Sequence, residues 1–231
     1  MVGAAALAVL ALVYVVSLRV ASSDVDSTSP ADSQREEVTE EPSGADSGAS
    51  AVIRRNADDP LSIGSVDAPA VLVVYSDYQC PYCAAWNDET LPVLMEYVDD
   101  DQLRIEWRDL NVYGQDSERA SLAAYAAGLQ GKFWEYHEAL FKDGETRQPD
   151  ELSEEGLVAL AGDLGLNTEQ FSYDMNSNET LDQIFVNALE GVELGAHSTP
   201  SFVLNDMTLV GAQPTEVFVG AVDEVLADGS M

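Results

Sequence analysis

The pattern of apolar and polar positions predicts alternating strands and helices from about residue 60 onward. Residues 70–76, AVLVVYS, are a continuous apolar and β-branched run, which is typical of a central strand buried on both faces. Residues 102–110, QLRIEWRDL, alternate Leu, Ile and Trp with Arg, Glu and Arg, so we expect a strand with one buried and one polar face. Between these two runs we expect a helix over residues 81–98, kinked at Pro92.

The second half of the chain is predominantly helical in pattern. Residues 115–195 contain several segments with helical spacing, and Ser153 and Ser177 stand where helix N-caps are expected. Residues 201–212 predict a hairpin, and residues 214–227 predict a final helix. The predicted order is strand, helix, strand, helical block, strand, strand, helix, which is a mixed α/β fold.

The first 59 residues differ from the rest in composition. Residues 1–18 carry no charged side chain and, as a helix, would span roughly 27 Å, close to the ~30 Å hydrocarbon core of a bilayer. We therefore expect a membrane anchor over residues 1–20, with a cleaved signal and secretion as the alternative. The positive-inside rule gives no support for an external C-terminus, since Arg19 follows the segment and no basic residue precedes it. Residues 21–59 are rich in Ser, Asp, Glu, Ala and Gly without an aromatic residue, which predicts an acidic disordered linker before a domain over 60–231.

The charge balance excludes one class of partner. Ten basic residues against 42 acidic ones give a formal net charge of -32. Nucleic-acid binding depends on clustered Lys and Arg, so we expect no nucleic-acid partner. The acidic residues are dispersed along the chain, which is more typical of a protein kept soluble at high salt than of one that recognises a cationic ligand.

The chain contains two cysteines, in the segment Cys80-Pro-Tyr-Cys83. A bridge between them would close a loop too short to stabilise the fold much by chain entropy. A zinc site needs about four ligands, and only His137 and His197 could join the pair without carboxylates, so we expect no metal. The spacing instead suits a redox-active dithiol, with one cysteine exposed at a helix N-terminus and its partner one turn inside.

The residues around the dithiol favour an acidic thiol at Cys80. Pro81 suits the first turn of a helix, which places Cys80 over unpaired N–H groups at the positive end of that helix. The helix dipole supplies ~2 kcal/mol at best, whereas lowering a thiol pKa from ~8.5 to ~5 takes nearly 5 kcal/mol. The remainder must come from hydrogen bonds to the sulfur, including those from Cys83. Because Tyr82 brings no cation to the loop, we expect a moderately acidic Cys80.

A second signal lies near the end of the helical block. In AHSTPSFVLN, residues 196–205, Thr199-Pro200 directly precedes a β-branched and aromatic strand. This context predicts a cis peptide bond at Pro200.

These motifs together resemble the thioredoxin superfamily and, within it, the DsbA-like thiol-disulfide oxidoreductases. YSDYQCPYC, GKFWEYHEALF and LGAHSTPSFVLN match that family in order and spacing, over nearly all of residues 60–228. The resemblance implies a thioredoxin fold with an inserted α-helical domain at about 111–195. It also implies Cys80 as the nucleophile, Cys83 as the resolving thiol and Pro200 as the cis-proline that faces them, with the Thr199 backbone offered to an extended substrate chain.

The sequence departs from the family at two places. Well-studied relatives have a histidine where Tyr82 stands, and CPYC is also typical of glutaredoxins, which weakens the expectation of a strong oxidant. Relatives often keep a buried acid on the strand before the dithiol, and residues 70–76 contain none; Asp77 is the nearest substitute, or else a cap or turn residue.

Three further side chains have more than one interpretation. His197 could approach Cys80 and stabilise its thiolate, or it could be an ordinary loop histidine. His137 lies among aromatic residues at helical spacing, which indicates packing, and we expect the same of Trp86.

Three functions are compatible with this sequence. The first is a membrane-tethered enzyme outside the cytoplasm that exchanges its disulfide with thiols of exported proteins, without a cofactor and with an unidentified membrane redox partner. The second is a reductase or isomerase with the same motif and the opposite direction of electron flow. The third is a non-catalytic binding module, which a buried and unreactive Cys80 would indicate.

Overall fold

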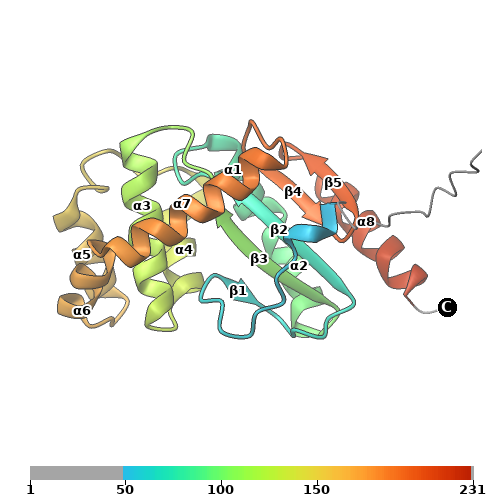
Figure 1. Cartoon of the computed structure of the whole chain (residues 1–231). Helices are drawn as coiled ribbons and strands as arrows, with labels where there is room; N and C mark the ends of the chain where they lie inside the picture. The colour runs from blue at the N-terminus through green and yellow to red at the C-terminus, as the bar shows by residue number, and fades with distance from the viewer. Residues whose placement is uncertain (1–48, 230–231) are drawn as a thin grey trace, which may run out of the picture. The chain divides into compact units, whose positions relative to one another are not determined.

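A five-stranded mixed sheet lies at the centre of the part of the chain that the structure, a computed structural model, describes, residues 49–229 (Figure 1). The strand order is β1-β3-β2-β4-β5; β2 and β3 are parallel, and the other neighbours are antiparallel. The strands are β1 Ser62–Ile63, β2 Ala70–Ser76, β3 Leu103–Asp109, β4 Ser201–Leu204 and β5 Met207–Val210. The central strand over residues 70–76 and the hairpin within 201–212 are thereby confirmed.

The helices follow the predicted order. They are α1 Pro81–Glu89, α2 Leu91–Asp99, α3 Gln115–Leu129, α4 Phe133–Leu140, α5 Glu154–Asp163, α6 Thr168–Met175, α7 Asn178–Glu193 and α8 Thr215–Asp228, with short 3₁₀ turns η1 Ala49–Val52 and η2 Lys142–Gly144. The expected helix over 81–98 is two helices that meet at Thr90, with Pro92 in the first turn of the second. Ser153 and Ser177 are N-caps, since their hydroxyls accept from the backbone N–H groups three residues later.

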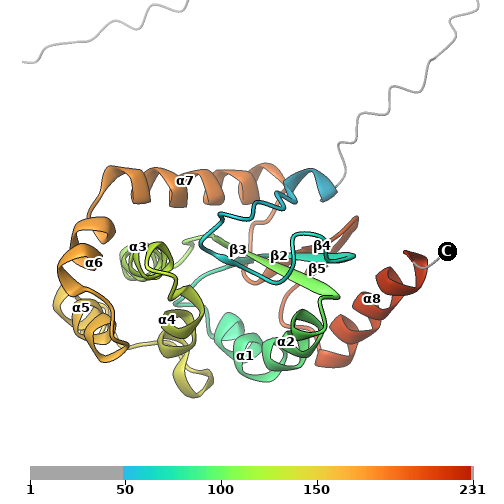
Figure 2. The same cartoon turned by 90° about the horizontal axis from the view of Figure 1, so that it is seen from below.

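Helices cover both faces of the sheet. Figure 2 shows α1 and α2 on one face, and α7 and η1 on the other. Along β2, Leu72 and Val74 belong to the core that includes α1 and α2, while Val73 and Tyr75 belong to a smaller cluster with Val52. This period of two explains why β2 is apolar throughout.

The helical block is an insertion between β3 and β4. Helices α3 to α6 pack together to one side of the sheet, and α7 returns the chain across one face of the sheet to β4 (Figure 2). This arrangement confirms a thioredoxin fold with an inserted α-helical domain.

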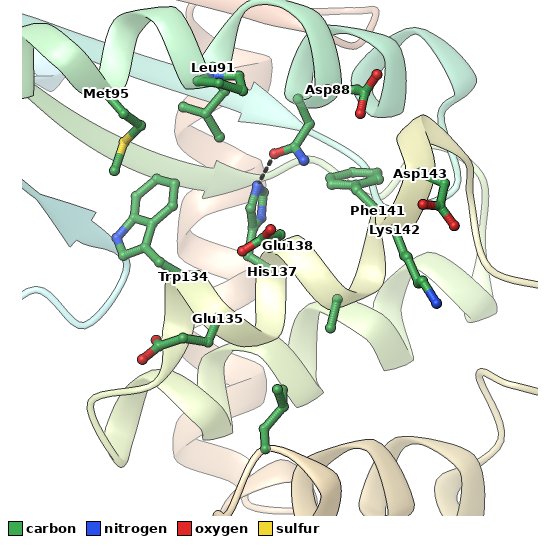
Figure 3. Close-up of a pocket in the computed structure, with 14 residues that line it drawn as sticks. Asp88, Leu91, Met95, Trp134, Glu135, His137, Glu138, Phe141, Lys142 and Asp143 are labelled. Carbon is green, nitrogen blue, oxygen red and sulfur yellow. Dashed lines mark hydrogen bonds between the residues drawn. The ribbon is translucent and has the colours of Figure 1, made fainter.

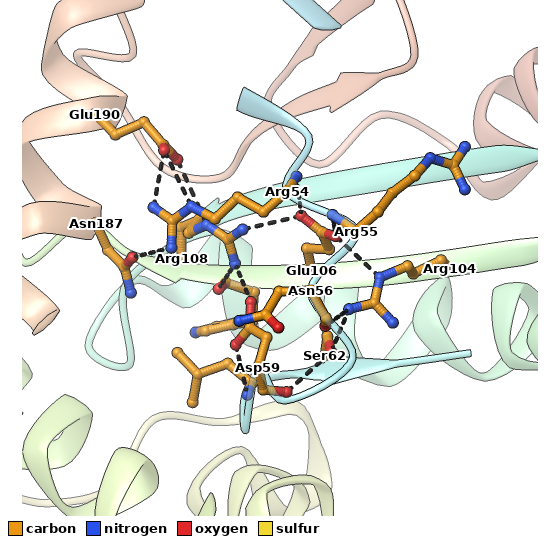
Figure 4. Close-up of polar contacts among 12 residues, drawn as sticks. Arg54, Arg55, Asn56, Asp59, Ser62, Arg104, Glu106, Arg108, Asn187 and Glu190 are labelled. Atoms are coloured by element: carbon orange, nitrogen blue, oxygen red, sulfur yellow. Dashed lines mark hydrogen bonds and ion pairs between the residues drawn. The ribbon is translucent and has the colours of Figure 1, made fainter. Parts of the chain in front are cut away.

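The polar face of β3 differs from the expectation, because all seven residues of the strand are buried. Glu106 lies between Arg104 and Arg108, and its two oxygens accept from Arg104 Nε and Arg108 Nη2, each at 2.9 Å (Figure 4). Arg108 also pairs with Asp59 at 3.1 Å and with Glu190 of α7 at 3.4 Å. The alternating charges therefore form a buried ion network, and do not face solvent.

Contacts with the fold begin before Pro60. Val52 is buried, and the backbone N–H groups of Arg54 and Arg55 donate to Glu106 at 3.0 and 2.8 Å (Figure 4). The linker expected over residues 21–59 therefore does not extend to its predicted end, because the carboxylate on β3 binds its last residues. The expected anchor over 1–20 and the rest of that linker lie outside the described residues.

Within residues 49–229, none of the helices is long and apolar enough to cross a membrane.

Candidate active site

Cys80 and Cys83 lie at the N-terminus of α1, where the chain leaves the central strand β2. Cys80 is the N-cap residue, and its N–H donates to the Asp77 carbonyl at 3.1 Å. Pro81 opens the helix, and the Cys83 and Ala84 N–H groups donate to the Cys80 carbonyl at 3.0 and 3.1 Å. The dithiol thus has the geometry that its spacing predicts, with Cys83 one turn inside the helix.

Hydrogen bonds to the Cys80 sulfur favour its thiolate. The Cys83 thiol makes the largest contribution, and burial acts against it; the Thr199 side chain and the N–H groups of Cys83 and Tyr82 also favour the charged form. Together they lower the pKa of Cys80 to about 6. A moderately acidic Cys80 is what the absence of a cation from the loop predicted.

Cys83 has the opposite environment. Burial raises the pKa of the Cys83 thiol, and its hydrogen bond to Cys80 raises it further. The Ser76 hydroxyl and the Asp77 N–H group act in the other direction, without outweighing burial. At neutral pH the reduced pair is therefore a Cys80 thiolate beside a Cys83 thiol.

The loop before β4 faces the dithiol. The Thr199-Pro200 bond is cis, as predicted. In the thiol form Cys80 donates to the Thr199 carbonyl at 3.3 Å. The Thr199 hydroxyl is buried without a partner among the described residues, so it is available to donate to the sulfur once the thiolate forms.

Cys80 is buried, which corrects the expectation of an exposed cysteine at the helix N-terminus. The helix end alone would leave the sulfur open to solvent. The Thr199 carbonyl contacts the sulfur from the cis-proline loop, and the negative charge of Cys80 raises the pKa of Tyr113 in the loop after β3. Sequence reasoning did not identify Tyr113, because its loop carries no recognisable motif.

Asp77 is fully buried and acts as a turn residue between two loops. One carboxylate oxygen accepts from the Gln79 N–H at 2.7 Å, and the other accepts from the Tyr113 N–H at 2.9 Å. The carboxylate therefore fixes the dithiol loop to the loop after β3, which is a positioning role.

The remaining predicted tuning residues are exposed. Pro81 and Tyr82 lie on the surface of the first turn of α1, with the Tyr82 side chain 66% exposed. His197 is exposed in the loop before the cis bond, and within residues 49–229 no hydrogen bond joins it to Cys80. A role of His197 in stabilising the thiolate therefore stays a prediction.

His137 and Trp86 are packing residues, as expected. His137 Nδ1 lies 3.1 Å from the Tyr78 hydroxyl and Nε2 lies 2.5 Å from Asn87 Oδ1, which suits a neutral ring that donates through Nε2. Burial lowers the pKa of His137 to about 3. Trp86 is buried against Phe202.

A groove of about 950 Å³ lies beside His137, between α4 and the ends of α1 and α2 (Figure 3). Trp134, Met95 and Leu91 supply apolar walls, and Glu138 supplies charge at its edge. Neither cysteine lines this groove, so the groove is not part of the dithiol site. Within the described range no group of three or more metal-ligating side chains could hold an ion.

Asp109, at the end of β3, is a buried acid that sequence reasoning missed. It is paired in register with Ser76, whose hydroxyl contacts Cys83, and its Oδ1 accepts from Trp107 Nε1 at 3.2 Å. Burial raises the pKa of Asp109 to about 6, and the charge of Asp77 acts in the same direction. The alternating pattern of residues 102–110 predicts a strand that includes Asp109, but it does not indicate that this end of the strand is fully buried.

We expect Asp109→Asn to raise the thermal unfolding temperature at pH 7.5. The carboxyl has a pKa of about 6 when folded and 3.8 as its ordinary value, so above pH 6 the folded state carries a buried charge that the unfolded state solvates. Removing that charge is worth about 3 kcal/mol at most. The advantage should shrink as the pH falls from 6 and vanish below 4, where both states are protonated in the parent.

Thermal unfolding of parent and variant from pH 3.5 to 8 tests this expectation. Asp77→Asn is the matched control: Asp77 accepts from two backbone N–H groups, so an amide in its place should destabilise the protein at pH 7.5. An Asp109→Asn variant that is less stable than its parent at pH 7.5 would contradict a free-energy cost of burying the Asp109 charge.

Comparison with known proteins agrees with this geometry. The family described as Thioredoxin matches residues 56–224. A Na(+)/H(+) antiporter NhaA of Herminiimonas arsenicoxydans is 35% identical over 155 residues, 64% of this chain and 23% of the antiporter. Disulfide bond formation protein D of Bacillus subtilis is 25% identical over 155 residues, 64% of this chain and 68% of that protein. The crystal structure of a thioredoxin-like oxidoreductase from Silicibacter pomeroyi has a TM-score of 0.62 at 30% identity, covering 74% of this chain and 98% of that one.

The dithiol at a helix N-terminus, opposite a cis-proline in a sheet with inserted helices, defines a class of redox protein. The chain belongs to the thioredoxin superfamily and, within it, to the DsbA-like thiol-disulfide oxidoreductases. It spans only about a quarter of the antiporter that it matches and about two thirds of the Bacillus protein.

Proposed function

We propose that this protein forms disulfide bonds in exported proteins outside the cytoplasm, by exchange with its Cys80–Cys83 disulfide. The observation that carries the proposal is the contrast between the two sulfurs, with the pKa of Cys80 lowered to about 6 and that of Cys83 raised. A stable Cys80 thiolate favours the reduced dithiol, and a protein whose reduced form is favoured passes its disulfide to others.

The exchange takes two steps. A substrate thiolate attacks the Cys80 sulfur, the Cys80–Cys83 bond breaks, and Cys83 leaves with the electron pair and takes up a proton. A second substrate thiolate then attacks the substrate sulfur of the mixed disulfide, and Cys80 leaves as a thiolate. Two substrate thiols are oxidised and one protein disulfide is reduced, so no cofactor enters the balance. The low pKa of Cys80 makes it the better leaving group in the second step.

The pKa of Cys80 also limits the strength of the oxidant. At pH 7 a thiol with a pKa of about 6 in place of 9 stabilises the reduced form by about 1.4 kcal/mol, which is about 30 mV for two electrons. This shift favours oxidation without reaching the most oxidising members of the superfamily.

The expected site of action follows from the sequence. The apolar stretch over residues 1–18 supports tethering to a membrane, or secretion after cleavage, and a protein with a single dithiol has no other thiol to mispair. Exported protein thiols are then the substrates that the dithiol meets, and a membrane redox partner would reoxidise it. Finding the mature protein in the culture medium would refute an uncleaved anchor.

The burial of Cys80 favours a second candidate, a binding module with an inactive dithiol. Two observations speak against it: the lowered pKa of Cys80 and the Thr199 hydroxyl that is available to donate to its sulfur. Cys80 is therefore buried, and its sulfur is nevertheless activated as a thiolate.

The equilibrium reduction potential of the full chain against glutathione, with Cys80→Ser as control, tests the proposal. A potential above about -200 mV, toward protein disulfide isomerase and DsbA, supports the oxidant. A lower potential overturns the direction and assigns a reductase. The absence of a reversible couple would establish the binding module.

A further inference from the structure

Helix α7 presents apolar side chains to solvent along its outer side. Figure 2 shows this helix at the edge of the described part of the chain, and its main contacts are with β3, α3 and α6. Five large apolar residues of the helix are 43 to 65% exposed, and together they form what we call the α7 face: Leu181, Phe185, Val186, Leu189 and Val192. Their spacing of three to four residues makes them neighbours on the helix surface. A contiguous exposed apolar patch of this kind marks an interaction site.

The fold does not need these side chains, because other contacts hold the inner side of α7. The buried residues of the helix, only one of which is a large apolar residue, are Thr180, Ile184, Asn187 and Gly191. Asn187 Oδ1 accepts from Arg54 Nη1 at 3.0 Å, and Gly191 leaves no room for a Cβ against the ring of Tyr75. The apolar and polar sides of α7 are therefore reversed relative to a helix that only packs on a core.

The charges beside the α7 face are all negative. Glu179, Asp182 and Glu193 are exposed on α7, and the helix contains no Lys or Arg. Within residues 49–229 no ion pair includes any of the three carboxylates. A ligand that covers the apolar residues would therefore lie beside carboxylates that have no counter-ion. Lys or Arg at the edge of that ligand would pair with them, as flanking charges do when two helices associate.

We propose that the α7 face is the docking site of a partner protein, which binds through an amphipathic helix whose apolar side is flanked by Lys or Arg. The face extends over roughly 16 Å from Leu181 to Val192, so about three turns of a partner helix would cover it. Apolar residues three and four apart on that helix would pack between those of α7, and its cations would contact the carboxylates beside the face. Neither cysteine belongs to the face, so docking leaves the dithiol free, and the inference goes beyond the proposed exchange.

Two other occupants fit the charges less well. A second copy of this chain would bring a second set of the same carboxylates to the interface, because a two-fold interface uses the same patch of both subunits. The net charge of -32 adds to that repulsion. Helices that lie on a membrane surface carry Lys and Arg on their polar side, and α7 has neither. A cationic helix is therefore the occupant that both the apolar and the charged residues favour.

Binding of a model peptide to the full chain tests the docking site. The probe is a fluorescein-labelled peptide of about 18 residues, with Leu at positions three and four apart and Lys elsewhere, followed by fluorescence anisotropy. Phe185→Gln, at the most exposed residue of the face, should weaken binding about tenfold, and Leu189→Gln gives an independent reading of that loss. Asp182→Asn combined with Glu193→Gln should weaken binding about threefold and reduce its dependence on salt.

The matched controls lie on α8, away from the α7 face. Val217→Gln replaces an exposed apolar residue there, and Glu216→Gln combined with Glu224→Gln removes the same charge as the α7 pair. Both controls should bind the peptide as the parent does. A second peptide with the same Leu positions and Glu in place of Lys should bind the parent at least about tenfold less tightly.

Several results would overturn the docking site. Equal affinity of the parent and Phe185→Gln for the Lys peptide does so, as does equal affinity of the parent for the two peptides. A parent that sediments as a dimer while Phe185→Gln sediments as a monomer would assign the face to a second copy. Phosphatidylcholine vesicles that retain more of the parent than of Phe185→Gln would assign it to a membrane. None of these measurements uses the dithiol, so an inactive protein that binds the peptide as expected would refute the proposed function and leave the docking site supported.

Discussion

Cys83→Ser is expected to turn the protein into a trap that accumulates mixed disulfides with its substrates, while Cys80→Ser is expected to lose exchange altogether. Cys80 carries the thiolate, and loss of such a nucleophile costs at least about a thousandfold in rate. Besides the second substrate thiol, Cys83 provides an intramolecular thiol that can release a trapped substrate from Cys80, since its N–H and sulfur both lie within hydrogen-bonding reach of that residue. Without Cys83, release depends on the second substrate thiol or on an external thiol.

Reoxidation of a reduced, unfolded polypeptide with two cysteines in a glutathione buffer measures this difference, since the oxidised glutathione supplies the two-electron oxidant that the single-cysteine variants lack. Non-reducing gels detect the mixed disulfide. Cys83→Ala belongs in the same series, because it removes the largest contribution to the low pKa of Cys80 and should raise that pKa, whereas the serine hydroxyl can still donate. Exchange by Cys80→Ser at the parental rate would be incompatible with Cys80 as the nucleophile.

Glu106→Gln is expected to destabilise the protein by about 3–5 kcal/mol, because it leaves two buried guanidinium groups without their shared carboxylate. The Glu106 oxygens accept from Arg104 Nε, Arg108 Nη2 and the backbone N–H groups of Arg54 and Arg55, at 2.8 to 3.0 Å. An amide presents a donor to donors at one of these positions. Urea unfolding at pH 7 measures the loss, and hydrogen exchange at Arg54 and Arg55 should accelerate in the variant.

The pH dependence and a surface control sharpen this test. Burial alone would raise the pKa of Glu106, but the Arg104 hydrogen bond, the Arg54 N–H and the Arg108 charge outweigh it and lower the pKa. The stabilisation is therefore present above the ordinary pKa of 4.5 and is lost as the pH falls through the lower folded value. Glu135→Gln breaks the exposed pair with Lys132 and should cost less than about 1 kcal/mol. Equal costs for the two substitutions would disprove the role of the buried network.

Most elements were predictable because their signals are local. The apolar run of β2, the capping serines of α5 and α7, and the hairpin β4–β5 all depend on residues close in sequence. The break of the first long helix at Thr90 follows from Pro92 in the next turn. The burial of β3 was not predictable in the same way, because its partners Arg54, Asp59 and Glu190 come from distant parts of the chain.

The residues of the candidate site also differ in whether a local sequence signal identifies them. Cys80, Cys83 and the cis bond at Pro200 were identified from spacing and context. Tyr113 and Asp109 were not, because neither belongs to a motif. The folding of the β3 end against the dithiol loop bonds the Tyr113 N–H to Asp77 and pairs Asp109 with Ser76.

The sequence by itself determined the dithiol, the order of the elements and the moderate acidity of Cys80, since each depends on neighbouring residues or on the chemistry of the cysteines. The inserted helical domain was implied by the family resemblance. Only the tertiary structure decided that Cys80 is covered, that the charges of β3 are buried and that Asp77 holds two loops together. The physical reason is burial: whether a charge or a sulfur is removed from water depends on segments that meet only in the folded chain.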